Sequence, residues 1–169
     1  MQQLTYSDYK PNAMKLPVWV LLDDVITPRN TGVIFRIADT MGAQGLVLCG
    51  NVPPSNHKLL SRTAKGADRH VPFVYYKNAT DAIEDYRKQG FLIVALEITD
   101  QSSDIKTIDF QQFDKILLIA GAEDSGVSQA VLDIVDFAVH IPTSGLSLSM
   151  NVAVSVAIAV YEIRRQLEV

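Results

Sequence analysis

Short, uninterrupted apolar segments alternate with segments of helical periodicity along almost the whole chain. The apolar segments, each long enough for one strand, are 18–22, 46–48, 71–75, 91–96, 115–120 and 137–141. The helical segments are 30–41, 55–60, 79–89, 128–134 and 150–166. Strands that are apolar throughout are buried on both faces. The sequence therefore predicts an α/β fold, a mostly parallel sheet flanked by helices, and Pro72 places the third strand at an edge.

A single domain accounts for the length. The 169 residues, 48% of them hydrophobic, suit one compact domain over 1–169, in which 1–16 form an N-terminal extension. Residues 101–109 are expected to be a polar loop within it. The start of the chain lacks the basic and apolar regions of a secretory signal, and the longest apolar stretch, 150–161, is too short to span a bilayer. We therefore expect a cytoplasmic protein without a membrane segment.

Cysteine and histidine offer little chemistry here. Cys49 is the only cysteine and follows an apolar run, so we expect an inert buried thiol. His57, His70 and His140 lack the spacing of metal ligands, and no metal is expected.

Charge is distributed unevenly along the chain. The net charge is −4, but residues 25–70 carry two acidic side chains and six basic ones: Arg29, Arg36, Lys58, Arg62, Lys65 and Arg69. A local positive field attracts a phosphate backbone whatever the total charge. A solvated basic face without a partner explains these counts equally well.

Polar and small residues follow four of the predicted strands, at 23–32, 96–103, 121–128 and 142–151. Ligands of open α/β sheets bind at the carboxyl ends of the strands, so chemistry is expected there. In the first segment Asn30 is a good helix N-cap, and Arg36 follows six residues later. They indicate either an anion-binding corner or an ordinary cap with a surface ion pair, for example to Asp39.

The last two segments each allow a structural and a functional interpretation. Two glycines, Gly121 and Gly126, surround Glu123, which permits close approach of a ligand or forms a tight turn capped by Ser128. The loop 142–151 leads into the C-terminal helix and either receives a flat ring or caps that helix through Ser149.

Together these segments resemble the three signature motifs of the SpoU-type RNA 2'-O-ribose methyltransferases, the TrmH family within the SPOUT superfamily. The order and the spacing both match over 18–166. The matching residues are Pro28, Asn30, Gly32 and Arg36 in the first motif, Gly121, Glu123, Gly126 and Ser128 in the second, and Ile141, Pro142, Gly145, Ser149 and Asn151 in the third. Met150 replaces the usual leucine.

The resemblance implies a C-terminal deep trefoil knot, a homodimer, and S-adenosylmethionine as the cofactor. The cofactor-binding residues implied by position are Leu96, Gly121, Ile141, Leu146, Ser149 and Asn151. The helix over 152–163 is apolar nearly all round, which fits burial against its own core and a partner subunit.

The resemblance also implies transfer of a methyl group to a ribose 2'-hydroxyl of RNA, with tRNA favoured over rRNA. The implied catalytic residues are Arg36, Asn30, Glu123, Ser149 and Asn151. Arg36 stabilises an alkoxide rather than acting as a base, because guanidinium stays protonated. Arg29, Arg62 and Lys65 are the expected RNA contacts.

Two alternatives stay open at this point. A nucleotide-dependent enzyme on a doubly wound sheet has the same alternation, but it needs a glycine-rich turn where this chain has Asp23, Asp24 and Val25. A non-catalytic RNA-binding or assembly protein would keep the fold without the reaction.

Overall fold

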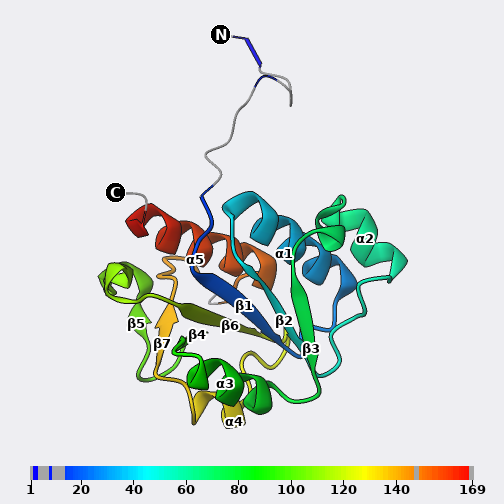
Figure 1. Cartoon of the computed structure of the whole chain (residues 1–169). Coiled ribbons are helices and arrows are strands. Elements are labelled where there is room, and N and C mark those ends of the chain that lie inside the picture. Colours follow the sequence, from blue (N-terminus) through cyan, green and yellow to red (C-terminus); the bar gives the residue numbers. More distant parts are fainter. Residues whose placement is uncertain (1, 4–7, 9–13, 147–148, 168–169) are drawn as a thin grey trace.

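The computed structural model describes residues 2–3, 8, 14–146 and 149–167. One parallel sheet of seven strands, in the order β3-β2-β1-β6-β4-β7-β5, runs through the protein (Figure 1). The strands are β1 (Val18–Asp23), β2 (Gly45–Cys49), β3 (Phe73–Tyr76), β4 (Leu92–Leu96), β5 (Ser103–Asp104), β6 (Ile116–Gly121) and β7 (Phe137–His140). The predicted α/β class is thus confirmed, and β3 lies at an edge as expected.

Helices cover both faces of the sheet. They are α1 (Pro28–Met41), α2 (Lys58–Ala64), α3 (Ala79–Lys88), α4 (Gln129–Leu132) and α5 (Val152–Leu167). The first, second and fifth lie on one face, and α3 and α4 lie on the other (Figure 1). Val20 and Leu22 of β1 pack in the first layer, while Leu21 between them packs in the second. This two-sided burial explains why the strand segments are apolar without alternation.

The expected polar loop over 101–109 was wrong in part. Ser103 and Asp104 form β5 beside β7, and two short 3₁₀ helices follow, Ile105–Thr107 and Phe110–Gln112. Phe110 is fully buried, so this segment belongs to the core. A two-residue polar strand leaves no apolar run by which a sequence could reveal it.

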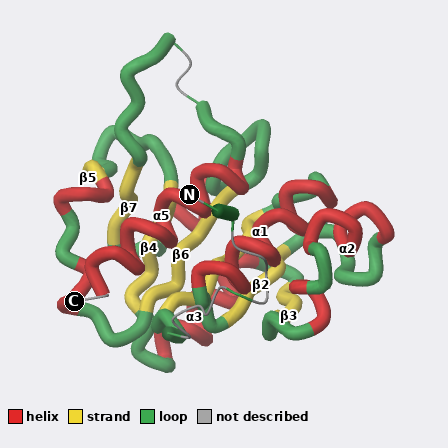
Figure 2. The backbone as a smooth tube through the Cα atoms, turned by 90° about the horizontal axis from the view of Figure 1, so that it is seen from above, coloured by secondary structure: helices red, strands yellow, loops and turns green. Residues whose placement is uncertain are grey.

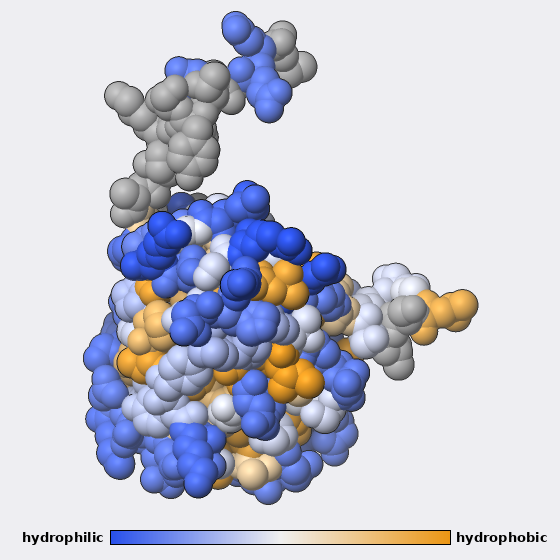
Figure 3. All heavy atoms as spheres, turned by 90° about the vertical axis from the view of Figure 1, so that its right-hand side faces the viewer, coloured by the Kyte–Doolittle hydropathy of each residue, from blue (hydrophilic) through white to orange (hydrophobic). Residues whose placement is uncertain are grey.

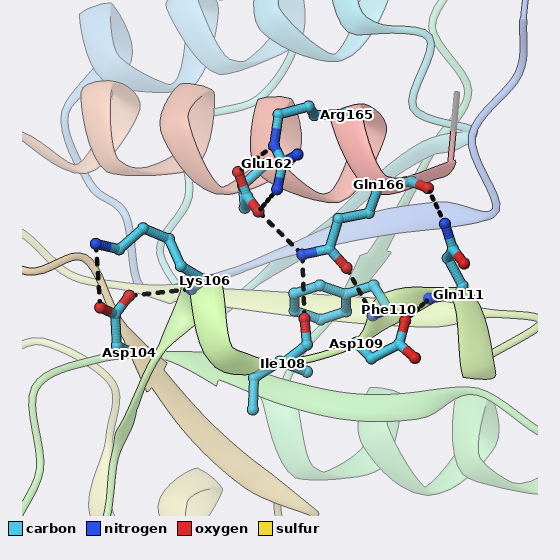
Figure 4. A network of polar contacts seen from close by, with 9 residues as sticks. All are labelled: Asp104, Lys106, Ile108, Asp109, Phe110, Gln111, Glu162, Arg165 and Gln166. Carbon is cyan, nitrogen blue, oxygen red and sulfur yellow. Dashed lines mark hydrogen bonds and ion pairs between the residues drawn. The ribbon is translucent and has the colours of Figure 1, made fainter. Parts of the chain in front are cut away.

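The end of α5 holds this segment in place (Figure 4). The side-chain oxygen of Gln166 accepts the Phe110 N–H at 2.8 Å, and its amide nitrogen donates to the Ile108 carbonyl at 3.0 Å. The same nitrogen donates to Glu162 at 2.9 Å. Hydrogen bonds from Arg165 hold the pKa of Glu162 below its usual value, against the opposing effect of burial. These contacts give the polar end of the helix a structural role.

Several smaller expectations can also be compared with the structure. Burial raises the pKa of the Cys49 thiol to about 12, which confirms an inert cysteine. The helix expected over 55–60 begins at Lys58, and His57 is its N-cap, accepting the Leu59 N–H. Within the described residues, no helix is long and apolar enough to cross a membrane, and no cluster of potential ligands could hold a metal ion. The trefoil knot stays a prediction.

Candidate functional site

A cleft of about 540 Å³ opens at the carboxyl ends of the central strands. Its walls are formed by 96–98 at the end of β4, 120–126 at the end of β6, 140–141 and 143 at the end of β7, and 149–152 and 155 at the start of α5. Three of the four predicted strand exits therefore converge on one cavity. The expected cofactor residues Leu96, Gly121 and Ile141 line it, as do Ser149 and Asn151.

Three side chains from distant parts of the chain meet at this cleft. The Asn30 side chain donates its amide to Glu123 at 2.6 Å. The Asn151 amide donates to the side-chain oxygen of Asn30 at 3.1 Å. Because Glu123 and Asn151 line the cleft, these bonds bring the first segment, on α1, to the two segments that form the cavity.

The expected N-cap role of Asn30 was wrong. Helix α1 begins at Pro28, and Thr27 is the N-cap residue, so Asn30 lies in the first turn. Proline is common at the first position of a helix because its missing N–H has no partner there in any case. The Asn30 side chain is therefore available for Glu123 instead of the helix end.

The expected cap of the last helix was also wrong. Asn151, and not Ser149, receives the free backbone N–H groups of α5, from Ala153 at 3.0 Å and from Val154 at 3.4 Å. The cap uses the oxygen of the Asn151 amide, so its nitrogen must be the atom that points to Asn30. One side chain thus starts the helix and contacts the first segment. Ser149 stays exposed at the cleft.

Glu123 is held as a carboxylate. Partial burial alone would raise its pKa, but hydrogen bonds from the side chains of Thr27 and Asn30 and from backbone N–H groups lower the pKa below its usual value. An ionised carboxylate only accepts hydrogen bonds, which orients the Asn30 amide with its nitrogen toward Glu123. Thr27 was not identified from the sequence, because it precedes the motif and has a common residue type.

The glycines of the second segment serve the loop itself. A Cβ on Gly121 would lie 2.0 Å from the backbone carbon of Gly126, where the loop folds back. Ala122 and Gly126 exchange backbone hydrogen bonds of 3.0 and 2.9 Å across this turn. These glycines therefore do not make room for a ligand: the chain's own backbone fills the space at Gly121, and the Glu97 carboxylate fills it at Gly126.

Two carboxylates hold this loop in place, one buried (Asp23) and one partly buried (Glu97). Asp23 accepts the Ser128 N–H at 3.0 Å, and Glu97 accepts the Val127 N–H at the same distance. Sequence reasoning missed Glu97 as a site residue, although it directly follows β4 in a segment where chemistry was expected.

Gly32 of the first segment has a packing role. A Cβ there would lie 2.0 Å from the Thr63 hydroxyl and 2.4 Å from the Leu60 carbonyl oxygen. Only glycine lets α1 approach α2 this closely. The contact fixes the end of α1 that carries Asn30.

Of the expected catalytic and cofactor residues, three do not line the cleft: Asn30, Arg36 and Leu146. Asn30 is connected to it through its hydrogen bonds to Glu123 and Asn151. Arg36 lies on the exposed face of α1 and does not line the cavity. Its expected ion pair with Asp39 is not formed among the described residues, and Asp39 instead pairs with His70 at 2.9 Å. Leu146 is fully exposed and also lies outside the cavity. Figure 2 shows the described segment after β7, which ends at Leu146, extending away from the sheet.

The expected RNA contacts lie on the surface. Arg29 is exposed on α1, and Arg62 and Lys65 are exposed on and just after α2, which packs against α1. Figure 3 shows the side of the molecule that carries α2 as mainly hydrophilic, with scattered hydrophobic patches. The three cations thus belong to neighbouring helices and are open to a large partner.

Comparisons with known proteins agree with this arrangement. The model of the SpoU rRNA Methylase family matches residues 17–161. An uncharacterized tRNA/rRNA methyltransferase of Borreliella burgdorferi is 34% identical over 148 residues, which cover 88% of this chain and 64% of the relative.

Solved structures are similar as well. The AdoMet-bound rRNA methyltransferase from Sinorhizobium meliloti has a TM-score of 0.85 at 29% identity, over 93% of this chain and 59% of that one. The SpoU methyltransferase AviRb from Streptomyces viridochromogenes, in complex with AdoMet, has a TM-score of 0.79 at 30% identity, over 88% and 60%. The chain thus spans a little under two thirds of the length of these relatives. Since the family model covers most of the chain, this protein belongs to the SpoU rRNA methylase family.

Proposed function

We propose that this protein transfers a methyl group from S-adenosylmethionine to a ribose 2'-hydroxyl of RNA, with tRNA preferred over rRNA, as a single cytoplasmic domain. The observation that supports this best is the chain of hydrogen bonds from Asn151 through Asn30 to Glu123 at the rim of the cleft. It joins one residue from each of the three motifs.

The cleft suits the methyl donor in size and charge. Its volume of about 540 Å³ lies within the usual range for ligand sites. Glu97, Glu123 and Asp124 line it, and the donor carries a positively charged sulfonium. Leu96, Gly121, Ile141 and Ser149 would hold the donor, largely through their backbone. When bound, it supplies a methyl group attached to a good leaving group.

The protein's contribution to the reaction is positioning and electrostatics. Asn30, held between Glu123 and Asn151, would orient the ribose, and Ser149 would contact the reacting end of the substrate. A positioned pair of reactants accounts for a large part of the rate increase of such a reaction. Arg36 would stabilise the developing alkoxide as a fixed positive charge, the hydroxyl proton would pass to an RNA phosphate or to water, and S-adenosylhomocysteine would leave.

A second copy of the chain would bring Arg36 to the site. Helix α5 leaves Val154, Ile158 and Tyr161 exposed at a spacing that forms one stripe, although its other side is buried. Helix α1 contacts α5, and Val33, also exposed, lies one turn from Arg36. Exposed apolar residues on adjacent helices favour a homodimer that covers this face. In that dimer Arg36 of one copy would reach the cleft of the other.

The RNA would bind across the basic side of α1 and α2. Arg29, Arg62 and Lys65 are exposed cations that can contact phosphates without reading sequence. Because the whole chain carries −4 and residues 25–70 are basic, the rest of the chain is acidic and disfavours phosphate contacts elsewhere.

Transfer of a tritiated methyl group tests the proposal. The protein is incubated with labelled S-adenosylmethionine and either total tRNA or ribosomal RNA, and the label in RNA is counted. We expect incorporation into tRNA, and Glu123→Gln should reduce it strongly. RNA binding without incorporation in either sample would instead support the non-catalytic alternative. Displacement of the donor by NAD would support a nucleotide-dependent enzyme.

A further inference from the structure

His140 lines the cleft, but no step proposed above uses it. It is the last residue of β7, next to the edge strand β5 and two strands away from β6 (Figure 1). The Asn30 contact with Glu123 lies on the other side, beyond the end of β6. His140 is therefore placed to contact the part of the methyl donor that does not react.

The hydrogen bonds of Ser102 determine which nitrogen of His140 carries a proton. The Ser102 hydroxyl accepts the Thr99 N–H at 2.9 Å and donates to the Thr99 carbonyl at 2.9 Å. Its oxygen lies 3.0 Å from Nδ1 of His140. A hydroxyl has one proton and two acceptor sites, so all of these contacts are hydrogen bonds together only when the proton goes to the Thr99 carbonyl and Nδ1 donates to Ser102.

The neutral ring is consequently protonated on Nδ1, and Nε2 is an acceptor. Among the described residues, Nε2 has no hydrogen-bond partner. The charged groups on the elements around the ring are Glu97 and Asp100 after β4, Asp104 and Lys106 in and after β5, and Glu123 and Asp124 after β6. Asp104 accepts the Lys106 N–H at 3.0 Å and lies 3.3 Å from the Lys106 ammonium, and both Glu97 oxygens accept backbone N–H groups. These two carboxylates are thus already engaged.

We infer that neutral His140 accepts a hydrogen bond through Nε2 from the adenosine part of the methyl donor, and that protonation of the ring weakens donor binding. The inference rests on the proposed function. Adenosine offers an amino group and ribose hydroxyls as donors, whereas an imidazolium has no acceptor left. Its positive charge would also repel the cationic donor.

Calorimetric titration between pH 5.5 and 8.5 tests the inference, with S-adenosylhomocysteine and 5'-methylthioadenosine as probes. For the wild type, we expect affinity for both probes to fall by about fivefold or more between pH 8.5 and pH 5.5, because a protonated ring no longer accepts the hydrogen bond. His140→Gln keeps an acceptor near the position of Nε2 but does not titrate. It should bind like the wild type at pH 8 and show no pH dependence.

Two further variants complete the design. His140→Phe removes the acceptor and should bind about fivefold more weakly at pH 8. His70→Gln, which removes an exposed histidine outside the cleft, should keep the wild-type pH dependence. A pH dependence that persists in His140→Gln, or full affinity of His140→Phe at pH 8, would overturn the inference. So would a dependence seen with S-adenosylhomocysteine alone, because 5'-methylthioadenosine keeps the adenosine part. Failure of the wild type to bind either probe at any pH would overturn the proposed function as well.

Discussion

The Asn151 side chain donates to Asn30 at 3.1 Å, across 121 positions of the sequence. Its oxygen at the same time caps α5. A single amide thus connects the start of the C-terminal helix to the first turn of α1.

Asn151→Asp should keep the cap of α5 but remove the hydrogen bond to Asn30. An aspartate caps a helix as well as asparagine does, but it cannot donate to Asn30 and it adds a negative charge near Glu123. We expect a melting temperature close to that of the wild type and a loss of methyl transfer of about tenfold or more, typical of a misplaced reactant. Single-turnover rates and circular dichroism measure the two effects.

The matched control for this variant is Asn78→Asp, the same change at the N-cap of α3, outside the cleft. It should leave methyl transfer unchanged. Equal activity of both variants would remove the Asn151 contact from the account.

The stability provided by the Glu123 carboxylate should depend on pH. Its pKa is lowered in the folded protein, so its contribution is present above the unfolded pKa and is lost as the pH falls through the folded pKa. In urea denaturation at pH 7, the wild type should therefore have a larger free energy of unfolding than Glu123→Gln. The difference should shrink below about pH 4.3, the ordinary value for glutamate. A difference that does not change between pH 7 and pH 3 contradicts this.

Gly121→Ala should destabilise the protein more than Gly66→Ala. At Gly121 the added methyl group meets backbone, a form of overpacking that costs typically about 1–3 kcal/mol or more. At Gly66 the space is open, and only its φ of +97° is unfavourable for alanine. Thermal unfolding compares the two, and a reversed order would show that the turn at 121–126 can adjust.

Two inactive variants should restore activity to each other if Arg36 acts across a dimer. Arg36→Ala removes the guanidinium, and Thr143→Trp fills the cleft from an exposed position. A mixed dimer then has one site with an intact cleft and an intact Arg36. We expect the mixture to recover activity that neither variant has alone. If Arg36 acts within its own chain, both sites of the mixed dimer stay inactive and no activity returns.

Removing two surface cations should weaken binding to RNAs of any sequence to the same extent. In the double variant Arg62→Ala and Lys65→Ala, the slope of log affinity against log salt should fall by about 2, one unit for each phosphate contact. Donor binding should not change. An unchanged slope would place the RNA elsewhere.

The sequence predicts the sheet well because strands buried on both faces are apolar throughout. It fails at β5, whose two residues are polar, and at the two helix starts that involve asparagine. For α1 a signal was available, since Pro28 is typical of a first helical position. For α5, Ser149 and Asn151 are both good caps, and only the folded loop decides between them.

The motif residues predict which side chains meet, but not how each one acts. Glycine at 32, 121 and 126 is required by close approach of the chain to itself, which depends on tertiary packing. Arg36 and Leu146 lie outside the cleft of one chain, and in our proposal Arg36 reaches a site only in a second copy of the chain. No local pattern contains that information.

The central claim is that the cleft presents a methyl donor to a ribose oxygen of RNA. Donor labelled with deuterium in its methyl group, followed by nuclease digestion of the RNA and mass spectrometry of the nucleosides, measures where the label goes. The account predicts a labelled methyl group on the ribose of one nucleoside, greatly reduced with Asn151→Asp. Label found on a base, or none in any RNA to which the protein binds, would contradict it.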